Sequence, residues 1–342
     1  MFQRAFAATL FILLGTIAVI AGCSKSDTAS TPTSQSSGGG NAAAPAPVTG
    51  KITIAVIPKG TTHIFWQSVR AGALRAAKEL GDVEINWNGP RSEAERGQQI
   101  QIVDDMLTQG VNGIVLAPID ANALVDTINT ASKKVPVVIF DSGANTETYK
   151  AFVATDNFKG GQLAGQRMLE LLPDGGEVAT VRTAAGSEST TQREEGFKSE
   201  IKKNPKIQLV AEPYGDSDRN KSQRVAGDIL AAHPQLKGFY GPNESSAFGI
   251  LGALRDYKKQ PGEIKFVGFD ASDDLRAGLN EGMIDSLVLQ DPVQMGHNAV
   301  VACVNVVRGK QVEKKQPIEP VLATQKNKDE PKVKELLNPK LD

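Results

Sequence analysis

The chain has 342 residues, of which 40% are hydrophobic and 23% are charged, and the part after residue 50 is long enough for two domains of ordinary size. Its 38 Lys and Arg residues against 39 Asp and Glu residues give a formal net charge of −1 at pH 7. This balance, together with the absence of a basic patch in the sequence, excludes the electrostatic footprint of a nucleic-acid-binding protein.

The first 22 residues have the parts of a secretory signal. Arg4 supplies a positive charge, residues 5–21 are almost entirely apolar, and small residues precede Cys23. The apolar stretch of roughly 17 positions is short for a membrane span, which needs about 20. Ending in Gly22-Cys23, the segment resembles a bacterial lipoprotein signal, which implies that residues 1–22 are removed and that Cys23 is acylated. An ordinary signal peptide or a membrane anchor is the alternative.

Residues 23–50 are dominated by Ser, Thr, Gly, Ala and Pro, and we expect them to form a flexible tether because such a composition cannot bury a core. If Cys23 carries lipid, the second cysteine, Cys303, has no partner and the exported chain has no intramolecular disulfide. Cys303 lies in an apolar run, which predicts a buried thiol.

From Lys51 onward, short β-rich runs alternate with longer helical patterns. Strands are expected at 51–57, 83–87, 112–116, 135–140, 177–182, 206–211, 237–240, 264–268 and 284–289. Helices are expected at 65–80, 92–109, 121–133, 158–172, 190–203, 218–232, 245–258, 272–281 and 294–308. This alternation predicts the α/β class with doubly wound parallel sheets. The number of units is too large for one sheet, so two similar lobes are expected.

The residues that directly follow the strands are mostly aromatic rings, short carboxylates and amides. Ligands of open α/β sheets bind at the carboxyl ends of the strands, which directs attention to these positions. Carboxylates, amides and an arginine form paired hydrogen bonds to neighbouring hydroxyls, and the C–H faces of a sugar pack on aromatic rings. The strand ends therefore suit a neutral polyol ring.

Six motifs follow one another in a recognisable order. They are Phe65-Trp-Gln-Ser-Val-Arg-Ala-Gly-Ala-Leu-Arg-Ala-Ala, Gly113-Ile-Val-Leu-Ala-Pro, Ala154-Thr-Asp-Asn-Phe-Lys-Gly-Gly, Arg193-Glu-Glu-Gly-Phe, Val267-Gly-Phe-Asp and Leu289-Gln-Asp-Pro. With them, residues 51–325 resemble the periplasmic sugar-binding proteins of the ribose-binding type, the solute receptors of ABC importers. The resemblance implies two lobes of the periplasmic-binding-protein type I joined by a three-segment hinge. The implied units are 51–155 with 292–321, and 156–291 with 322–342.

The resemblance also implies the function. It implies reversible, non-catalytic capture of a monosaccharide, a pentose such as ribose or a related hexose, and its delivery to an ABC permease in the inner membrane. It implies no cofactor, metal or nucleic acid, and a monomer held in the cell envelope by its N-terminal lipid. A sensory subunit that presents a sugar or another small polar solute to a chemoreceptor or sensor kinase is the alternative.

Carried over residue by residue, the resemblance implies a set of ligand-binding side chains. They are Lys59, His63, Phe65, Trp66, Asp141, Ser142, Arg193, Asn243, Phe269, Asp270 and Gln290. Phe65 is expected to stack on the sugar and Phe269 to oppose it. Lys59, His63 and Ser142 depart from the ribose pattern, which argues against ribose itself but not against another sugar of pentose or hexose size.

Several of these side chains have structural alternatives. Trp66 could cover the core of its lobe, and Trp87 could either line the cleft or pack beneath a helix. His63 and Lys59 could face solvent. Helix capping is expected for Asp120 and a salt bridge at a helix start for Arg219, while Asp156 could either face the cleft at a strand end or cap a helix.

Two further function classes fit poorly. Asp141 and Asp270 could form a glycosidase pair, but a nearby arginine is expected to hold both ionised, which leaves no general acid. A transcriptional regulator would need a DNA-binding head where residues 24–50 stand. No phosphate-binding Gly-x-x-x-x-Gly-Lys-Ser/Thr motif occurs, so an ATPase partner would be another polypeptide.

Overall fold

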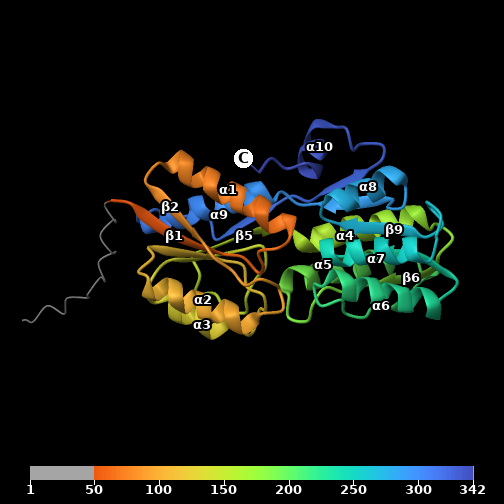
Figure 1. The fold of residues 1–342 in the computed structure, drawn as a ribbon, viewed down its shortest axis with the longest axis horizontal. Helices are drawn as coiled ribbons and strands as arrows, with labels where there is room; N and C mark the ends of the chain where they lie inside the picture. Colours follow the sequence, from red (N-terminus) through yellow and green to blue (C-terminus); the bar gives the residue numbers. More distant parts are fainter. Residues whose placement is uncertain (1–49, 342) are drawn as a thin grey trace, which may run out of the picture. The chain divides into compact units, whose positions relative to one another are not determined.

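The computed structural model describes residues 50–341, so the predicted signal, Cys23 and all of the predicted tether except Gly50 lie outside the described residues. The described chain forms two six-stranded sheets, each covered by helices on both faces (Figure 1). Among these residues no helix is both long enough and apolar enough to cross a membrane.

The first sheet has the strand order β11-β5-β4-β3-β1-β2, and every neighbouring pair is parallel. Its strands are β1 (Ile52–Ile57), β2 (Val83–Trp87), β3 (Gly113–Leu116), β4 (Val137–Phe140), β5 (Ala151–Thr155) and β11 (Lys315–Ile318). Helices α1 (Ile64–Leu80) and α9 (Pro292–Val307) cover one face, and α2 (Arg96–Thr108) and α3 (Val125–Ser132) the other (Figure 1). Strands β3 and β4 are buried throughout, which explains their continuous apolar sequences. We call this part the first lobe.

The second sheet has the order β12-β10-β9-β8-β6-β7, and only β12 runs antiparallel to its neighbour. Its strands are β6 (Gly176–Thr180), β7 (Ile207–Ala211), β8 (Leu236–Tyr240), β9 (Lys265–Phe269), β10 (Ser286–Leu289) and β12 (Val321–Thr324). Helices α4 (Asn157–Leu171) and α5 (Glu188–Ile201) cover one face. The other face carries α6 (Arg219–Ala232), α7 (Glu244–Asp256) and α8 (Asp273–Glu281). This is the second lobe.

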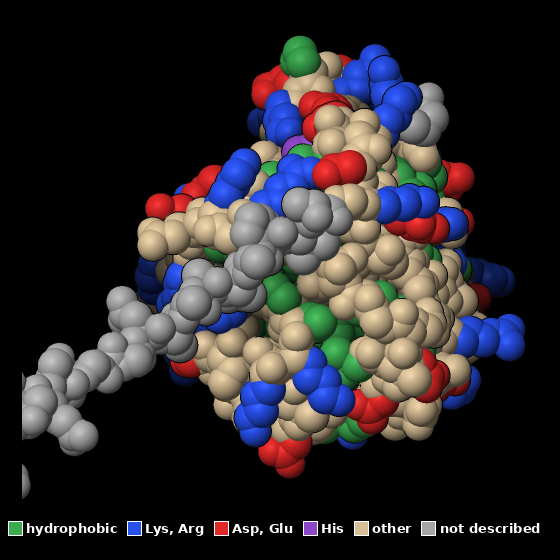
Figure 2. Space-filling view, turned by 90° about the vertical axis from the view of Figure 1, so that its left-hand side faces the viewer, with side chains coloured by type: hydrophobic (Ala, Val, Ile, Leu, Met, Phe, Trp, Pro, Cys, Tyr) green, Lys and Arg blue, Asp and Glu red, His purple; other side chains and the backbone are tan. Residues whose placement is uncertain are grey.

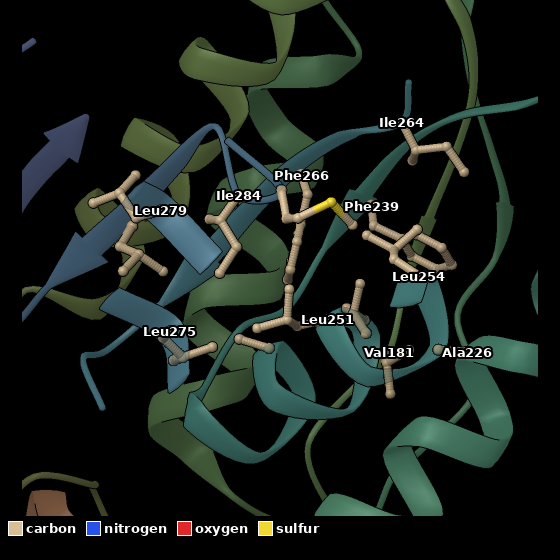
Figure 3. Packing of buried hydrophobic residues seen from close by; sticks show 14 of the residues in the cluster. Val181, Ala226, Phe239, Leu251, Leu254, Ile264, Phe266, Leu275, Leu279 and Ile284 are labelled. Carbon is tan, nitrogen blue, oxygen red and sulfur yellow. The ribbon is translucent and has the colours of Figure 1, made fainter. Parts of the chain in front are cut away.

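The core on that other face of the second sheet is the largest buried apolar cluster of the second lobe (Figure 3). Phe239 and Phe266 on the sheet meet Leu251 and Leu254 of α7. The last helix, α10 (Pro331–Leu337), adds three buried side chains to the same cluster: Val333, Leu336 and Leu337. The C-terminal segment is thereby fixed to the second lobe by apolar burial.

The chain passes between the two sheets three times: from β5 to α4, from β10 to α9 and from β11 to β12. This confirms the predicted fold class of two α/β lobes joined by three segments. The last crossing is short, because β11 ends at Ile318 and β12 begins at Val321. Val321, which the sequence places at the end of the first-lobe segment, pairs with Leu289 in the second sheet. Three strands were not among those expected from the sequence: β5, β11 and β12.

Two helices begin later than the sequence predicts. Residues 92–95 precede α2 in turns and bends, and residues 121–124 form a turn before α3. Asp120 accepts hydrogen bonds from the backbone N–H groups of Asn122 and Ala123, so it caps this turn instead of the helix itself. Asp156 does cap its helix, by accepting from the N–H of Lys159.

Cys303 is fully buried in α9 against the first sheet, as predicted. Burial raises the pKa of its thiol to about 12. The thiolate, which is the reactive form, is therefore scarce at neutral pH.

On the face seen in Figure 2, acidic and basic side chains of the described residues are interspersed, and neither sign forms a continuous patch. This distribution agrees with the small net charge of the sequence.

Candidate functional site

Side chains from both lobes meet in a cleft at the carboxyl ends of the two sheets. The lining residues are Lys59, His63, Phe65, Trp66, Glu93 and Asp141 of the first lobe and Ser189, Thr190, Arg193, Asn243, Glu244, Asp270 and Gln290 of the second. The cavity that remains between them is about 30 Å³, room for one or two water molecules. The lobes are therefore closed on one another in this structure.

Two of the lining carboxylates follow strands with the same unusual backbone. Asp141, after β4, has φ 61°, and Asp270, after β9, has φ 71°. Non-glycine residues seldom adopt this left-handed conformation, although aspartate does so more often than most. The turn directs the chain out of each sheet directly beside the cleft, and each carboxylate is almost fully buried there.

Lys59 enters the cleft from the loop after β1 and is only 3% exposed. Its ammonium lies 3.0 Å from Oδ2 of Asp141 in the same lobe. It also donates to the hydroxyl oxygens of Ser187 and Ser189 in the second lobe, at 3.2 and 3.0 Å. All three donors of the ammonium are thus satisfied by protein groups, two of them across the cleft. The alternative of a solvated Lys59 is wrong.

Glu93 lies in the loop between β2 and α2 and was not predicted as a site residue. Its Oε1 accepts from Trp66 Nε1 at 2.9 Å, and its Oε2 accepts from Ser217 Oγ of the second lobe at 3.1 Å. His63 Nδ1 is 3.7 Å from Oε1. Burial alone would raise the pKa of Glu93, but the charges of His63 and Lys59 and the two hydrogen bonds outweigh it and lower that pKa.

In the second lobe, Asp270 is held by a network. Gln290 Nε2 donates to its Oδ1 at 2.6 Å, and the backbone N–H of Glu244 donates to Oδ2 at 3.0 Å. Arg193 Nη1 lies 4.0 Å from Oδ2. Burial raises the pKa of Asp270 despite these partners. The expectation that an arginine leaves no carboxyl with a raised pKa is therefore wrong, because desolvation exceeds the pull of the cation.

Phe65 and Trp66, the aromatic pair at the start of α1, have different roles: Trp66 packs mainly in the core, and Phe65 lines the cavity. Trp66 is 2% exposed and packs in the first-lobe core, edge-on to Phe140 with 6.1 Å between ring centroids. It also borders the cavity through its position beside Glu93. Phe65 is half-buried and lines the cavity with its ring perpendicular to that of Trp66. Trp87 packs against the core and does not line the cavity.

Two predicted site residues lie behind the cavity wall. The ring of Phe269 is fully buried beneath the guanidinium of Arg193, whose carbon is 3.9 Å from the ring centroid. Ser142 is fully buried, and its hydroxyl accepts from the backbone N–H of Ser189 across the lobes. The other nine predicted residues line the cavity.

Four lining residues were missed by the sequence analysis: Glu93, Ser189, Thr190 and Glu244. Glu244 directly follows Asn243, which caps α7 through Ser246 N–H while also facing the cleft. Glu244 pairs with Arg219 at the start of α6, which confirms the salt bridge expected there. Position after a strand was the signal that could have found Glu244. Serine and threonine at the start of α5 carried no comparable signal.

Backbone groups at the rim close the cleft further. Ala121 N–H donates to Gly186 O at 3.0 Å, and Gly143 N–H donates to Glu188 Oε2 at 3.0 Å. Gly186 lies so close to the first lobe that a Cβ placed on it would lie 2.2 Å from Oδ2 of Asp120. A side chain on residue 186 would therefore meet the carboxylate of Asp120, which would have to move.

A larger hollow of about 780 Å³ lies elsewhere, between α9, α1 and the C-terminal α10. It is bordered by Asp291, which Lys332 of α10 contacts at 2.8 Å, and by none of the cleft residues. Among the described residues no group of three or more His, Cys, Asp or Glu side chains is arranged to hold a metal ion.

Residues 54–311 match the family model described as a periplasmic binding protein domain. The chain is 27% identical over 270 residues to the ribose import binding protein of Escherichia coli, covering 79% of this chain and 89% of that protein. It is similar to two solved structures with TM-scores of 0.81. One is a solute-binding protein of Agrobacterium vitis with bound D-fucose, 34% identical over 83% of this chain and 99% of that one. The other is a carbohydrate-transporter protein of Agrobacterium radiobacter with D-arabinose, 31% identical over 84% and 99%.

Proposed function

Because the chain belongs to the family of periplasmic binding proteins, we propose that it captures a monosaccharide of pentose or hexose size between its lobes and delivers it to an ABC import permease. One observation carries the sugar assignment: an aromatic ring and hydrogen-bonding side chains of both lobes converge on one interlobe cleft, which must widen from the arrangement described here to hold a monosaccharide. Relatives that bind ribose, fucose and arabinose support the same ligand class.

The capture is reversible and involves no bond making. A sugar enters the open form, contacts one lobe, and closure then brings the second set of hydrogen-bonding groups to it. The ligand stabilises the closed state because only that state offers both sets. We propose the hinge-linked units 51–155 with 292–321, and 156–291 with 322–342, as the bodies that move.

We assign the roles by position. Phe65 stacks on the C–H face of the ring, while Asp141, Asp270 and Gln290 accept from or donate to its hydroxyls. Arg193 donates from above Phe269. The remaining predicted site residues act as hydrogen-bonding or supporting groups: Lys59, His63, Trp66, Ser142 and Asn243.

We further propose that Cys23 is acylated and that residues 23–50 tether a monomeric receptor to an envelope membrane. The sequence of residues 1–23 supports this assignment. Cells that express the chain should incorporate labelled palmitate into it, and Cys23→Ser should abolish the label and release the protein from the membrane fraction. Unchanged labelling in Cys23→Ser would contradict the anchor.

A thermal-shift panel of D-ribose, D-arabinose, D-galactose, D-glucose, an amino acid and a purine nucleoside tests the ligand class. At least one sugar should raise the melting temperature, with calorimetry then giving a Kd. Stabilisation by the amino acid or the nucleoside alone would refute the sugar assignment.

Asp270→Ala tests the site. We expect it to abolish the sugar-induced thermal shift while the free protein stays folded, because Asp270 belongs to a network that faces the cavity. The left-handed backbone at Asp270 adds a cost of about 1–2 kcal/mol to alanine. Asp270→Asn, which tolerates that backbone, is the matched variant, and wild-type affinity in both would show that the ligand binds elsewhere.

A further inference from the structure

Four carboxylates line the cleft, and three of them have an arginine or lysine partner. Asp141 faces Lys59 at 3.0 Å, and Asp270 faces Arg193 at 4.0 Å. Glu244 accepts from Arg219 Nε at 3.2 Å. Each of these pairs brings one negative and one positive charge, so together they leave the cleft with no net charge.

Glu93 is the fourth carboxylate, and its hydrogen-bond donors are uncharged. They are the indole of Trp66 and the hydroxyl of Ser217, at 2.9 and 3.1 Å. The side chain that comes closest to acting as its counter-ion is His63, whose Nδ1 lies 3.7 Å from Oε1 of Glu93 and whose ring is charged only when protonated. Lys59 lies in the same cleft but all three of its donors are taken by Asp141 and two serines.

The charge on Glu93 persists in spite of burial. Its side chain is 13% exposed. Desolvation would raise its pKa, but His63, Lys59 and the two donors together hold the pKa below the ordinary value. When the imidazole is uncharged its lowering effect is lost, but Lys59 and the two hydrogen bonds still favour the carboxylate, and an ionised Glu93 then gives the cleft one negative charge more than its lysine and arginine side chains offset.

We propose that Glu93 sets the charge class of the ligand: the cleft accepts an uncharged or an amino sugar and rejects a sugar acid. This inference rests on the proposed function and adds the charge selection to it. In a largely buried cleft, unlike charges attract and like charges repel more strongly than in bulk solvent. A monosaccharide is smaller than the screening length of about 8 Å, so a charge at any ring position senses Glu93.

The orientation of Glu93 fits this role. It is held by Trp66 of its own lobe and, in the closed arrangement, by Ser217 of the second lobe, so closure fixes the position of the charge. An ammonium on the sugar would supply the missing positive charge. A carboxylate on the sugar would place a second anion in a cavity whose described lysine and arginine side chains already face carboxylates of the protein.

The test compares three forms of the neutral sugar selected by the panel above: the parent, its 2-amino-2-deoxy derivative and its uronic acid. Calorimetry is done at about pH 8, above the ordinary pKa of a histidine side chain in water. For the wild type we expect the uronic acid to bind at least about tenfold more weakly than the parent, and the amino sugar to bind at least as tightly. Glu93→Gln should reduce the ratio of the amino-sugar affinity to the uronic-acid affinity by about tenfold or more.

Glu84→Gln is the matched control, because it removes the same charge from an exposed pair with Lys51 at the opposite end of the sheet. Glu84→Gln should leave the ratio of the amino-sugar affinity to the uronic-acid affinity unchanged. Glu93→Gln keeps an oxygen that can accept from Trp66, so the site retains its shape.

An equal loss for all three sugars in Glu93→Gln would show that Glu93 only braces Trp66 and would overturn the inference. Tight binding of the uronic acid by the wild type would overturn it as well, and in both cases the proposed function would stand. If no neutral sugar binds at all, the proposed function fails and the charge selection fails with it.

Discussion

At the scale of single residues, Lys59 shows how a side chain can serve closure instead of contacting solvent. Its loop follows β1, but two of its hydrogen-bond partners lie 128 and 130 residues further along the chain. A buried lysine is costly unless it is paired and fully hydrogen-bonded, and here it is both. The interactions of Lys59 therefore stabilise the closed arrangement specifically.

Lys59→Met tests this. We expect weaker sugar binding by about tenfold or more, because the variant leaves Asp141 buried without its cation and removes two interlobe hydrogen bonds. Since the two serine contacts join the lobes and form only on closure, stopped-flow measurements should show faster dissociation with little change in association. Lys51→Met, at an exposed pair, should change neither rate. Slower association with unchanged dissociation would contradict a role in closure.

The sequence could predict such a residue as belonging to the site but not its role. Strand-end position and motif were enough for Asp141, Asp270 and Gln290, because topology alone brings those ends to one edge. Glu93 was not predicted as a site residue because it lies several residues after its strand, in a loop whose path brings it to the cleft. Phe269 was placed at the correct strand end, yet it lies behind Arg193, a packing detail that no local pattern carries.

At the scale of elements, the contact of α4 with α5 positions the guanidinium of the site. A Cβ on Gly161 of α4 would lie 2.0 Å from the carbonyl oxygen of Arg193, and one on Gly196 of α5 would lie 2.1 Å from that of Phe158. The two helices approach this closely because each has a glycine at the contact. Arg193 Nε then reaches Asn157 Oδ1 at 2.8 Å.

Gly161→Ala should therefore destabilise the protein by about 1–3 kcal/mol, since the added methyl group forces the helix backbones apart. We also expect weaker sugar binding, because Arg193 moves with α5. Denaturant unfolding measures the first effect and calorimetry the second. Gly97→Ala in α2, where a Cβ meets nothing within 4 Å, is the control and should be neutral or slightly stabilising. Stability equal to the wild type in Gly161→Ala would refute the close contact.

Most helices and strands were predictable at this scale because periodicity reflects burial. The continuous apolar runs of β3 and β4 and the helical patterns between strands reported the layers directly. The strands β5, β11 and β12 and the helix α10 were not among the expected elements, and β11 and β12 are edge strands whose pairing is decided by the passage of the chain between lobes. Unlike β3 and β4, which have the same length, β11 and β12 are not continuous apolar runs.

At the scale of the whole molecule, closure depends on the fit of two rims. Gly186 in the second lobe faces Asp120 in the first, where a Cβ would lie 2.2 Å from a carboxylate oxygen. A side chain at this position would meet the opposite rim before the lobes reach the observed arrangement. The rims thus set how far the cleft can close.

Gly186→Ala should hold the lobes apart and weaken sugar binding by about tenfold or more, because the closed-state contacts form incompletely. In solution scattering, the sugar-saturated variant should have a larger radius of gyration than the sugar-saturated wild type. The φ of 86° at Gly186 makes alanine strained there in either state. Adding Asp120→Ala separates the two effects: it should restore compactness and part of the affinity, and no restoration would refute the rim contact.

Because Cys303 is buried, cysteines introduced elsewhere can be labelled selectively and used to measure sugar binding by fluorescence. The sequence has two cysteines, and the one in the described residues is sealed in α9 with its thiol pKa raised to about 12. In a Cys23→Ser background, a new cysteine at an exposed position on each rim would react with a dye while Cys303 stays untouched. Because the rims meet only on closure, such a labelled protein would convert the arrival of a sugar into a change of fluorescence.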